Sequence, residues 1–186
     1  MRKGWFIIPG VQDGDRTVEE QAEALRPAMA EAAGKTVLDL GCAEGLLTRE
    51  FIYAGAKMAF GVDSVPAHLD VAREVCKGMP VQFAQCLLGT VALRTPAPSF
   101  DIVMALGVVH KLPFPDVGVR IAAQLSHDLV LLRSGLRQRN GIITAKQHPQ
   151  NTCDSHALMR EHGFELEKVV QGPGPHFESV EYWRKA

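Results

Sequence analysis

The chain has 186 residues, 46% of them hydrophobic and 22% charged, which are ordinary values for one globular domain and argue against a disordered chain. Lys and Arg number 20 against 21 for Asp and Glu, so the net charge of −1 provides no broad attraction for a phosphate backbone and disfavours a nucleic-acid partner. The four cysteines lack the spacing of a metal site and the density of a disulfide scaffold, so we expect reduced thiols in a cytoplasmic protein. No apolar run approaches the ~20 residues that span a bilayer, so no membrane partner is expected. We predict a single domain over residues 1–186.

The N-terminal region divides into two predicted parts. Residues 1–16 contain glycines and charged residues without a clear period, and we expect a flexible segment or a lid that closes over a ligand. Residues 17–33 have the pattern of an amphipathic helix. Thr17 and Glu20 have the spacing of the capping box that starts such a helix.

Residues 36–45, TVLDLGCAEG, are the most informative stretch of the chain. Their short apolar run suits a strand that is covered on both faces. Gly41 and Gly45 flank a turn, where glycine allows unusual φ angles and a close approach of the backbone to a ligand. Residues 45–54 continue as a helix that ends before Gly55. The unit predicts a ligand site at the end of the strand.

A second strand, residues 60–63, ends in Asp63. A carboxylate at this place can accept hydrogen bonds from both hydroxyls of a ribose, as in open α/β folds that bind nucleosides. Together with the glycine-rich turn, Asp63 predicts a cofactor that contains a nucleoside.

The details of the turn indicate which cofactor. A dinucleotide fingerprint has the pattern G-x-G-x-x-G, whereas this turn has Asp39, Gly41, Ala43 and Gly45 at alternate positions. The chain resembles the class I S-adenosylmethionine-dependent methyltransferases, whose first motif is (D/E)-x-G-x-G-x-G, with Ala43 in place of the middle glycine. Asp39 is negatively charged, so it suits the cationic methionine part of this cofactor and would repel a phosphate. A nicotinamide-dependent oxidoreductase is the alternative, which the spacing disfavours.

The resemblance implies a Rossmann-like α/β fold, a doubly wound sheet of about seven strands that are mostly parallel, with an antiparallel C-terminal strand. The rest of the sequence has elements in the matching order, and Ser64 is expected to cap the helix after Asp63. Further strands are predicted at residues 81–85, 100–106, 129–132, 164–170 and 180–183, and helices at 117–125 and 154–162, around an irregular insertion or hairpin at 134–151.

The resemblance also implies where S-adenosylmethionine and its product S-adenosylhomocysteine would lie. Asp63 would bind the ribose, Asp39 would order the methionine ammonium, and Gln85 stands where many relatives have an acid for the adenine amino group. The full set of expected cofactor-binding residues is Asp39, Gly41, Cys42, Ala43, Gly45, Asp63, Ser64, Gln85 and Leu106.

Residues 99–110, SFDIVMALGVVH, resemble the fourth-strand segment of this family, written F-D-x-V followed by six residues and His. His110 is therefore the candidate for a general base or positioning group, since its unperturbed pKa of ~6.5 suits proton transfer near neutrality. A structural histidine in the following turn is the alternative. Residues 106–109 contain no acidic ligand, so no metal is expected.

Basic residues gather after the fifth predicted strand, where they suggest an anionic small-molecule acceptor, and a solvated loop is the alternative. They are Arg133, Arg137, Arg139, Lys146 and His148. We predict methyl transfer from S-adenosylmethionine to an oxygen, nitrogen or other nucleophile of a small molecule by in-line displacement. A binding module of the same fold without catalysis is a further alternative.

Overall fold

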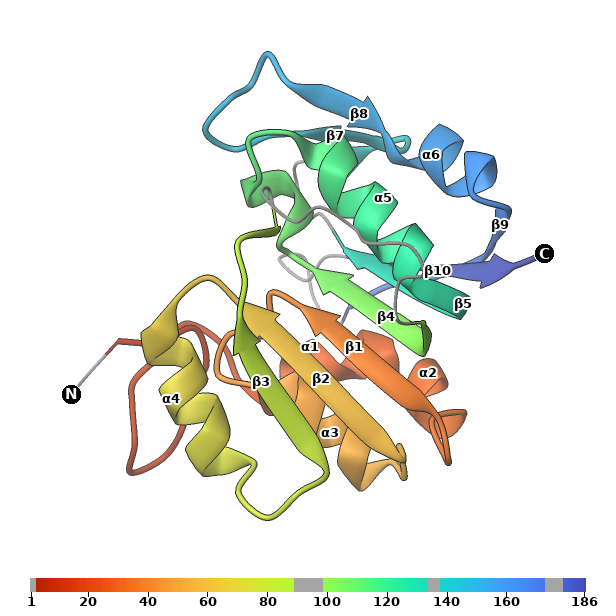
Figure 1. Ribbon diagram of the computed structural model, residues 1–186. Helices are drawn as coiled ribbons and strands as arrows, with labels where there is room; N and C mark the ends of the chain where they lie inside the picture. The colour runs from red at the N-terminus through yellow and green to blue at the C-terminus, as the bar shows by residue number, and fades with distance from the viewer. Residues whose placement is uncertain (1–2, 89–98, 134–137, 173–178) are drawn as a thin grey trace.

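The computed structural model describes residues 3–88, 99–133, 138–172 and 179–186, without the side chains of residues 138 and 139. Seven strands form one sheet: β1 (Thr36–Leu40), β2 (Met58–Asp63), β3 (Val81–Gln85), β4 (Phe100–Leu106), β5 (Ser126–Arg133), β9 (Phe164–Val170) and β10 (Val180–Lys185). They lie in the order β3-β2-β1-β4-β5-β10-β9 (Figure 1). Strands β1 to β5 are parallel, while β10 runs antiparallel to both β5 and β9. The predicted Rossmann-like sheet with an antiparallel C-terminal strand is confirmed.

Helices cover both faces of the sheet (Figure 1). One face carries α1 (Val18–Ala22), the 3-10 turn η1 (Glu23–Leu25), α2 (Arg26–Ala30) and α3 (Leu46–Tyr53), and the other carries α5 (Pro115–Leu125) and α6 (Ser155–Glu161). Helix α4 (Pro66–Val75) packs beside β3 at the edge of the sheet. No helix in the described ranges is long and apolar enough to cross a membrane.

The helix predicted at residues 17–33 begins as expected but is not continuous. Thr17 Oγ1 accepts a hydrogen bond from the Glu20 N–H at 3.3 Å, and Glu20 Oε2 accepts one from the Thr17 N–H at 3.2 Å, which completes the capping box. Pro27 has no N–H with which to continue the α-helical ladder. The Arg26 N–H instead donates to the Glu23 carbonyl, as in a 3-10 turn, and the segment forms α1, η1 and α2 in succession.

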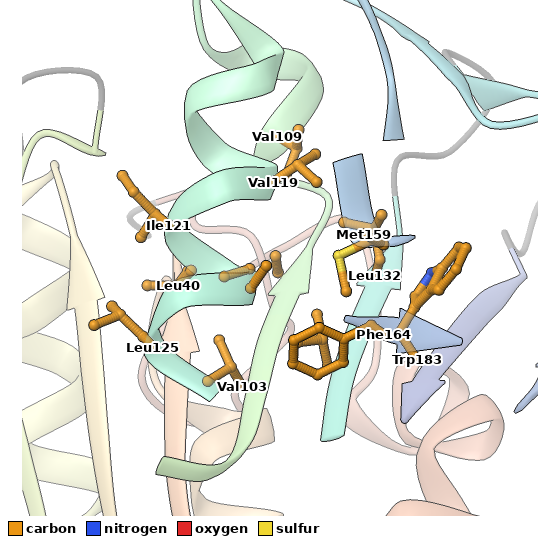
Figure 2. Close-up of a cluster of buried hydrophobic side chains, with 14 of the residues drawn as sticks. Leu40, Val103, Val109, Val119, Ile121, Leu125, Leu132, Met159, Phe164 and Trp183 are labelled. Atoms are coloured by element: carbon orange, nitrogen blue, oxygen red, sulfur yellow. The ribbon is translucent and has the colours of Figure 1, made fainter. Parts of the chain in front are cut away.

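Alternating side chains of β4 pack against the two helical layers. Ile102 and Met104 join the apolar cluster under α1 to α3, while Val103 and Ala105 join the cluster under α5, and all four are fully buried. Figure 2 shows the second cluster, in which Val119 of α5 is among the side chains that meet the strands. Since both faces are covered, the carboxyl ends of the parallel strands are the place where this kind of sheet binds ligands.

A small second sheet lies within and directly after the irregular insertion that was predicted at residues 134–151. Strands β6 (Gln138–Arg139), β7 (Ile142–Thr144) and β8 (Thr152–Asp154) pair antiparallel in the order β6-β7-β8. Asn140 and Gly141 connect β6 to β7 with φ of 49° and 83°, the positive values that a two-residue hairpin turn requires. Residues 134–137 lie outside the described part of the chain.

Candidate functional site

A cavity of about 500 Å³ opens at the carboxyl ends of β2, β3 and β4. Its walls are built largely from residues 62–65, 86–88, 106–108 and 111–114. Most of these side chains are apolar, and Lys111 is the only Lys or Arg among the described residues that line the cavity. Of the predicted cofactor-binding residues, five line this cavity: Gly41, Ala43, Asp63, Ser64 and Leu106.

Backbone hydrogen bonds hold the turn after β1 against β2. The N–H groups of Gly41 and Cys42 both donate to the Val62 carbonyl, at 2.7 and 3.0 Å. Gly41 has a φ of 79°, and a Cβ there would lie 2.8 Å from the Val108 side chain, so the position requires glycine. Ala43, which stands at the middle glycine of the family motif, also has a positive φ of 48°. Ala43 thus adopts a left-handed backbone conformation that glycine takes more readily.

Asp63 connects this turn to the start of α4. Its Oδ2 accepts a hydrogen bond from the Ala43 N–H at 3.0 Å, and its Oδ1 accepts one from the Val65 N–H at 2.9 Å. Val65, rather than Ser64, is the N-cap of α4, and it makes no side-chain cap. The predicted cap at Ser64 is wrong, and the hydrogen bond from the Val65 N–H to Asp63 fixes the turn that leads into α4 without capping the helix.

A second cavity, of about 30 Å³, lies on the other side of the turn and is lined by Asp39, Cys42 and Arg133 among others. Asp39 is 3% exposed, and its Oδ2 accepts a hydrogen bond from Thr48 Oγ1 at 2.7 Å. Burial raises the pKa of Asp39 to about 7, against the Thr48 hydrogen bond and with a smaller contribution from the negative charge of Asp63. Asp39 therefore changes charge near neutral pH unless a cation is bound beside it.

The remaining predicted cofactor-binding residues lie outside both cavities. Gln85 Nε2 donates to the Ser64 carbonyl at 3.2 Å at the protein surface. Gly45 has a φ of 73°, and a Cβ there would lie 2.8 Å from the ring of Phe83 and 3.0 Å from the Ala72 side chain. Glycine at position 45 therefore allows β3, α4 and the start of α3 to pack closely.

His110 lies in the 3-10 turn η3 (Val109–Lys111) that follows β4. It is half-buried and is not among the residues that line the two cavities, whereas the next residue, Lys111, lines the large one. A catalytic role for His110 remains a prediction.

The described members of the basic cluster do not gather at the large cavity. Arg133 is buried at the end of β5 and lines the small cavity instead. Lys146 and His148 lie in the loop between β7 and β8 and line neither cavity. Arg137 and the side chain of Arg139 lie outside the described part of the chain.

The N-terminal segment, predicted as a flexible segment or a lid over a ligand, borders the candidate site. Within residues 3–16, the Gly4 N–H donates to the Asp13 carbonyl and the Ile7 N–H to the Arg16 carbonyl, both at 2.8 Å. Trp5 lines both cavities. Its ring centroid lies 4.3 Å from Lys111 Nζ and 5.1 Å from the Arg16 guanidinium carbon.

Glu44 attaches this segment to the turn. The Glu44 carboxylate is fully buried and accepts hydrogen bonds from the backbone N–H groups of Trp5, at 2.9 Å, and Phe6, at 3.4 Å. His68 stands between two carboxylates, with Nε2 3.8 Å from Glu44 Oε1 and Nδ1 3.5 Å from Asp63 Oδ1. No local pattern in the sequence distinguishes Glu44 from an exposed residue of the turn, because its partners are 38 and 39 positions away.

Comparison with known proteins agrees with this geometry. A family model described as a methyltransferase domain matches residues 37–127, the span from the first strand to the start of β5. Residues 37–127 form a domain of the class I S-adenosylmethionine-dependent methyltransferases. The match includes the turn, Asp63 and the segment around His110.

Curated relatives of this domain differ in the acceptors that their names give. The ubiquinone biosynthesis O-methyltransferase of Nitrosococcus oceani is 37% identical over 98 residues, covering 52% of this chain and 41% of that protein. The tRNA U34 carboxymethyltransferase of Hydrogenovibrio crunogenus is 28% identical over 119 residues, covering 61% of this chain and 36% of that protein. The chain thus spans about two fifths of the length of these curated relatives.

Among solved structures, the fold is similar to that of magnesium protoporphyrin IX methyltransferase from Synechocystis. The TM-score is 0.70 at 15% sequence identity, with 93% of this chain and 87% of that chain covered. The fold therefore extends well beyond the residues that the family model matches.

Proposed function

We propose that this methyltransferase binds S-adenosylmethionine at the carboxyl edge of its sheet and transfers the methyl group to a small-molecule acceptor. The observation that carries the proposal is the position of Asp63, at the end of β2, in the wall of the large cavity and beside the turn after β1. A family likeness alone would support the fold, whereas function depends on the site.

The hydrogen bonds of Asp63 leave it able to hold a ribose. Each carboxylate oxygen accepts one backbone N–H, from Ala43 or Val65. An ionised carboxylate has about four acceptor positions in all, so each oxygen retains capacity for one ribose hydroxyl. The two amides also fix the orientation of the carboxylate before any ligand binds.

The chemistry of the two cavities fits the other parts of the cofactor. Asp39 in the small cavity would accept a hydrogen bond from the methionine ammonium, close to the exposed backbone of Gly41 and Ala43. The apolar segment 86–88 of the large cavity would cover the adenine, a role for which Gln85 points the wrong way, toward the Ser64 carbonyl. When bound, S-adenosylmethionine supplies a methyl group that is already activated by the sulfonium, so the protein mainly has to align the acceptor.

The acceptor would occupy the end of the large cavity next to η3. Leu112, Pro113 and Phe114 form an apolar wall there, and Lys111 contributes a positive charge. Phe114 is 59% exposed at this wall, which leaves apolar surface for a ligand to cover. We infer an acceptor with an apolar body and one anionic or acidic group, with a polyanionic nucleic acid disfavoured by the near-neutral charge of the chain.

Ligand-induced thermal stabilisation tests cofactor binding. S-adenosylhomocysteine should raise the melting temperature of the protein while NAD and NADP should not, because only a ligand that binds the folded state stabilises it. Asp63→Ala should remove most of this shift. Asp70→Ala is the matched control, since that carboxylate is exposed on α4 and pairs only with Arg73 among the interactions found for it. Stabilisation by NAD, or an unchanged shift in Asp63→Ala, would contradict the proposal.

Release of S-adenosylhomocysteine tests whether the protein transfers the methyl group to an acceptor. Incubation of the protein and S-adenosylmethionine with apolar phenols and carboxylic acids should give turnover that Lys111→Met reduces through a higher KM. Binding of the cofactor without turnover on any member of the panel would instead indicate a binding module. Efficient methylation of tRNA would contradict the proposal that the acceptor is a small molecule.

A further inference from the structure

Three polar side chains form a hydrogen-bonded series at the amino ends of two neighbouring strands. Ser99 directly precedes β4, Asp101 lies near the start of β4, and His127 lies near the start of β5. Ser99 Oγ lies 2.8 Å from His127 Nδ1, and His127 Nε2 lies 3.1 Å from Asp101 Oδ1. A hydroxyl beside an imidazole whose other nitrogen faces a carboxylate is the arrangement that activates a serine for nucleophilic attack.

The first residue of β1 orients the carboxylate of this series. Asp101 Oδ2 accepts hydrogen bonds from the N–H and the hydroxyl of Thr36, both at 2.7 Å, so Oδ1 remains for His127. Partial burial opposes ionisation of Asp101, but the hydrogen bonds from Thr36 and His127 outweigh it and hold the pKa of Asp101 below its ordinary value. Asp101 is therefore ionised at neutral pH.

The ionised carboxylate determines where the neutral imidazole carries its proton. A carboxylate can only accept hydrogen bonds, so the Nε2 of neutral His127 carries the hydrogen that faces Asp101. The Nδ1 is then an acceptor, and the Ser99 hydroxyl donates to it. His127 can thus take the proton of Ser99 as the serine oxygen attacks, which is the role of a general base.

The series is remote from the candidate cofactor site. Ser99, Asp101 and His127 line neither of the two cavities. The large cavity opens at the carboxyl ends of the strands, whereas these residues lie at the amino ends of β4 and β5 (Figure 1). The seven residues of β4 separate the two edges of the sheet by about 20 Å. Ser99 is exposed and the His127 side chain is 55% exposed, so a small reagent can reach the serine from solvent.

We propose that Ser99, His127 and Asp101 form a second reactive site, in which Ser99 takes an acyl group from a small activated ester. This activity goes beyond the proposed methyl transfer and does not depend on it. Ser99 Oγ forms a bond to the acyl carbon, the bond from that carbon to the leaving oxygen breaks, and the Ser99 proton passes through His127 Nδ1 to the leaving group. Water then attacks the acyl-serine with the same imidazole as base, which releases the carboxylic acid and restores the serine.

A fluorophosphonate probe tests the nucleophile directly. The Ser99 oxygen should displace fluoride from phosphorus while His127 takes the proton, and peptide mapping by mass spectrometry should find the phosphonate on Ser99. S-adenosylhomocysteine should not slow this labelling, because the cofactor cavity lies at the other edge of the sheet. Labelling that is absent from the folded, unmodified protein, or that occurs only at other serines, would overturn the proposal.

Two variants separate an activated serine from a structural contact between strands. His127→Gln removes the base and should slow labelling by roughly a hundredfold or more, the usual range for general-base catalysis. Asp101→Asn keeps an oxygen for Thr36 but presents an N–H to His127 Nε2, so it reverses the tautomer and should slow labelling to a similar extent. Equal labelling rates in the unmodified protein and in folded His127→Gln would overturn the proposal.

One further variant controls for the loss of an imidazole. His162 lies at the C-terminal end of α6, where its Nδ1 is 2.9 Å from the Leu158 carbonyl, and it lines neither cavity. His162→Gln should be labelled at the rate of the unmodified protein. A loss of labelling as large as that in His127→Gln would contradict the assignment of the base to His127.

Hydrolysis of p-nitrophenyl acetate tests acyl transfer to the serine. The unmodified protein should release a burst of about one equivalent of p-nitrophenolate per molecule as Ser99 is acetylated, followed by slower turnover. Ser99→Ala changes an exposed residue outside the strands, so it should fold normally and lose the burst. A burst that persists in Ser99→Ala would overturn the proposal.

Discussion

Replacing the buried acid of the turn should stabilise the free protein at neutral pH. Burial raises the folded-state pKa of Asp39 from an ordinary 3.8 to about 7, so folding favours the protonated side chain. Stability from this group is complete below the unfolded-state pKa and is lost as the pH rises through the folded-state pKa. At ~1.4 kcal/mol for each pKa unit, the loss reaches on the order of 4 kcal/mol above neutrality. Asparagine does not titrate, and its carbonyl can still accept the Thr48 hydroxyl.

The comparison of Asp39→Asn with the unmodified protein by urea unfolding checks this reasoning. In the absence of ligand, the stability advantage of the variant should grow from near zero at about pH 4 to on the order of 4 kcal/mol at about pH 8. Asp70→Asn, at an exposed carboxylate, should show no comparable growth. A difference between the Asp39 variant and the unmodified protein that does not change with pH would refute the argument.

Ionisation of Asp39, which lowers the stability of the free protein, should raise its affinity for the cofactor. Only the ionised Asp39 attracts an ammonium, so affinity for S-adenosylhomocysteine should rise with pH up to about 7, by at most tenfold for each pH unit, and Asp39→Asn should abolish this rise. A stabilised variant that no longer binds the cofactor would show that the buried acid is kept for function.

Three other substitutions test separate parts of the structure. His110→Ala should lower turnover with little change in cofactor affinity if the imidazole accepts a proton, and normal turnover per folded molecule would assign it a structural role. Gly61→Ala should lower the free energy of unfolding by roughly 1–3 kcal/mol, since a Cβ there would lie 2.6 Å from the ring of Phe83, and an unchanged melting temperature would contradict this contact. Arg184 forms ion pairs with three carboxylates that lie on α2's C-cap, β5 and β9, so Arg184→Met should destabilise by roughly 1 kcal/mol. That loss should shrink at high salt, where screening weakens both the pairs and the repulsion left behind, and a salt-independent loss would point to packing instead.

The sheet could be predicted from the sequence because its strands are defined locally. Strands β3, β4 and β9 have the predicted boundaries, and β3 and β9 start directly after Pro80 and Gly163, residues that interrupt regular structure. The helix at residues 17–33 was less well predicted, since its apolar period continues through Pro27 while the backbone ladder does not. The spacing of apolar residues indicates which face of a helix is buried. It gives no information on the backbone N–H that Pro27 lacks, so it cannot predict the break.

The site was predictable only where its residues belong to one strand and the turn that follows. Asp63 and Gly41 fall at the cavity because both stand at the ends of parallel strands. The contact between Arg133 and Gln21 could not be predicted, since the two residues are 112 positions apart and no local pattern in the sequence indicates it. Glu44 is a comparable case, since its carboxylate accepts hydrogen bonds from the distant N-terminal segment. Such contacts depend on packing of the complete fold.

The placement of the two tryptophans gives this protein a pair of built-in optical probes. Trp183 is fully buried in the core, where its Nε1 donates to Glu181 Oε2 at 3.0 Å, so its emission reports on the integrity of the fold. Trp5 lies against two cations and in the wall of both cavities, so its emission responds to what occupies them. Trp183→Phe leaves Trp5 as the single tryptophan, and cofactor and acceptor titrations can then be followed through its emission on an unlabelled protein.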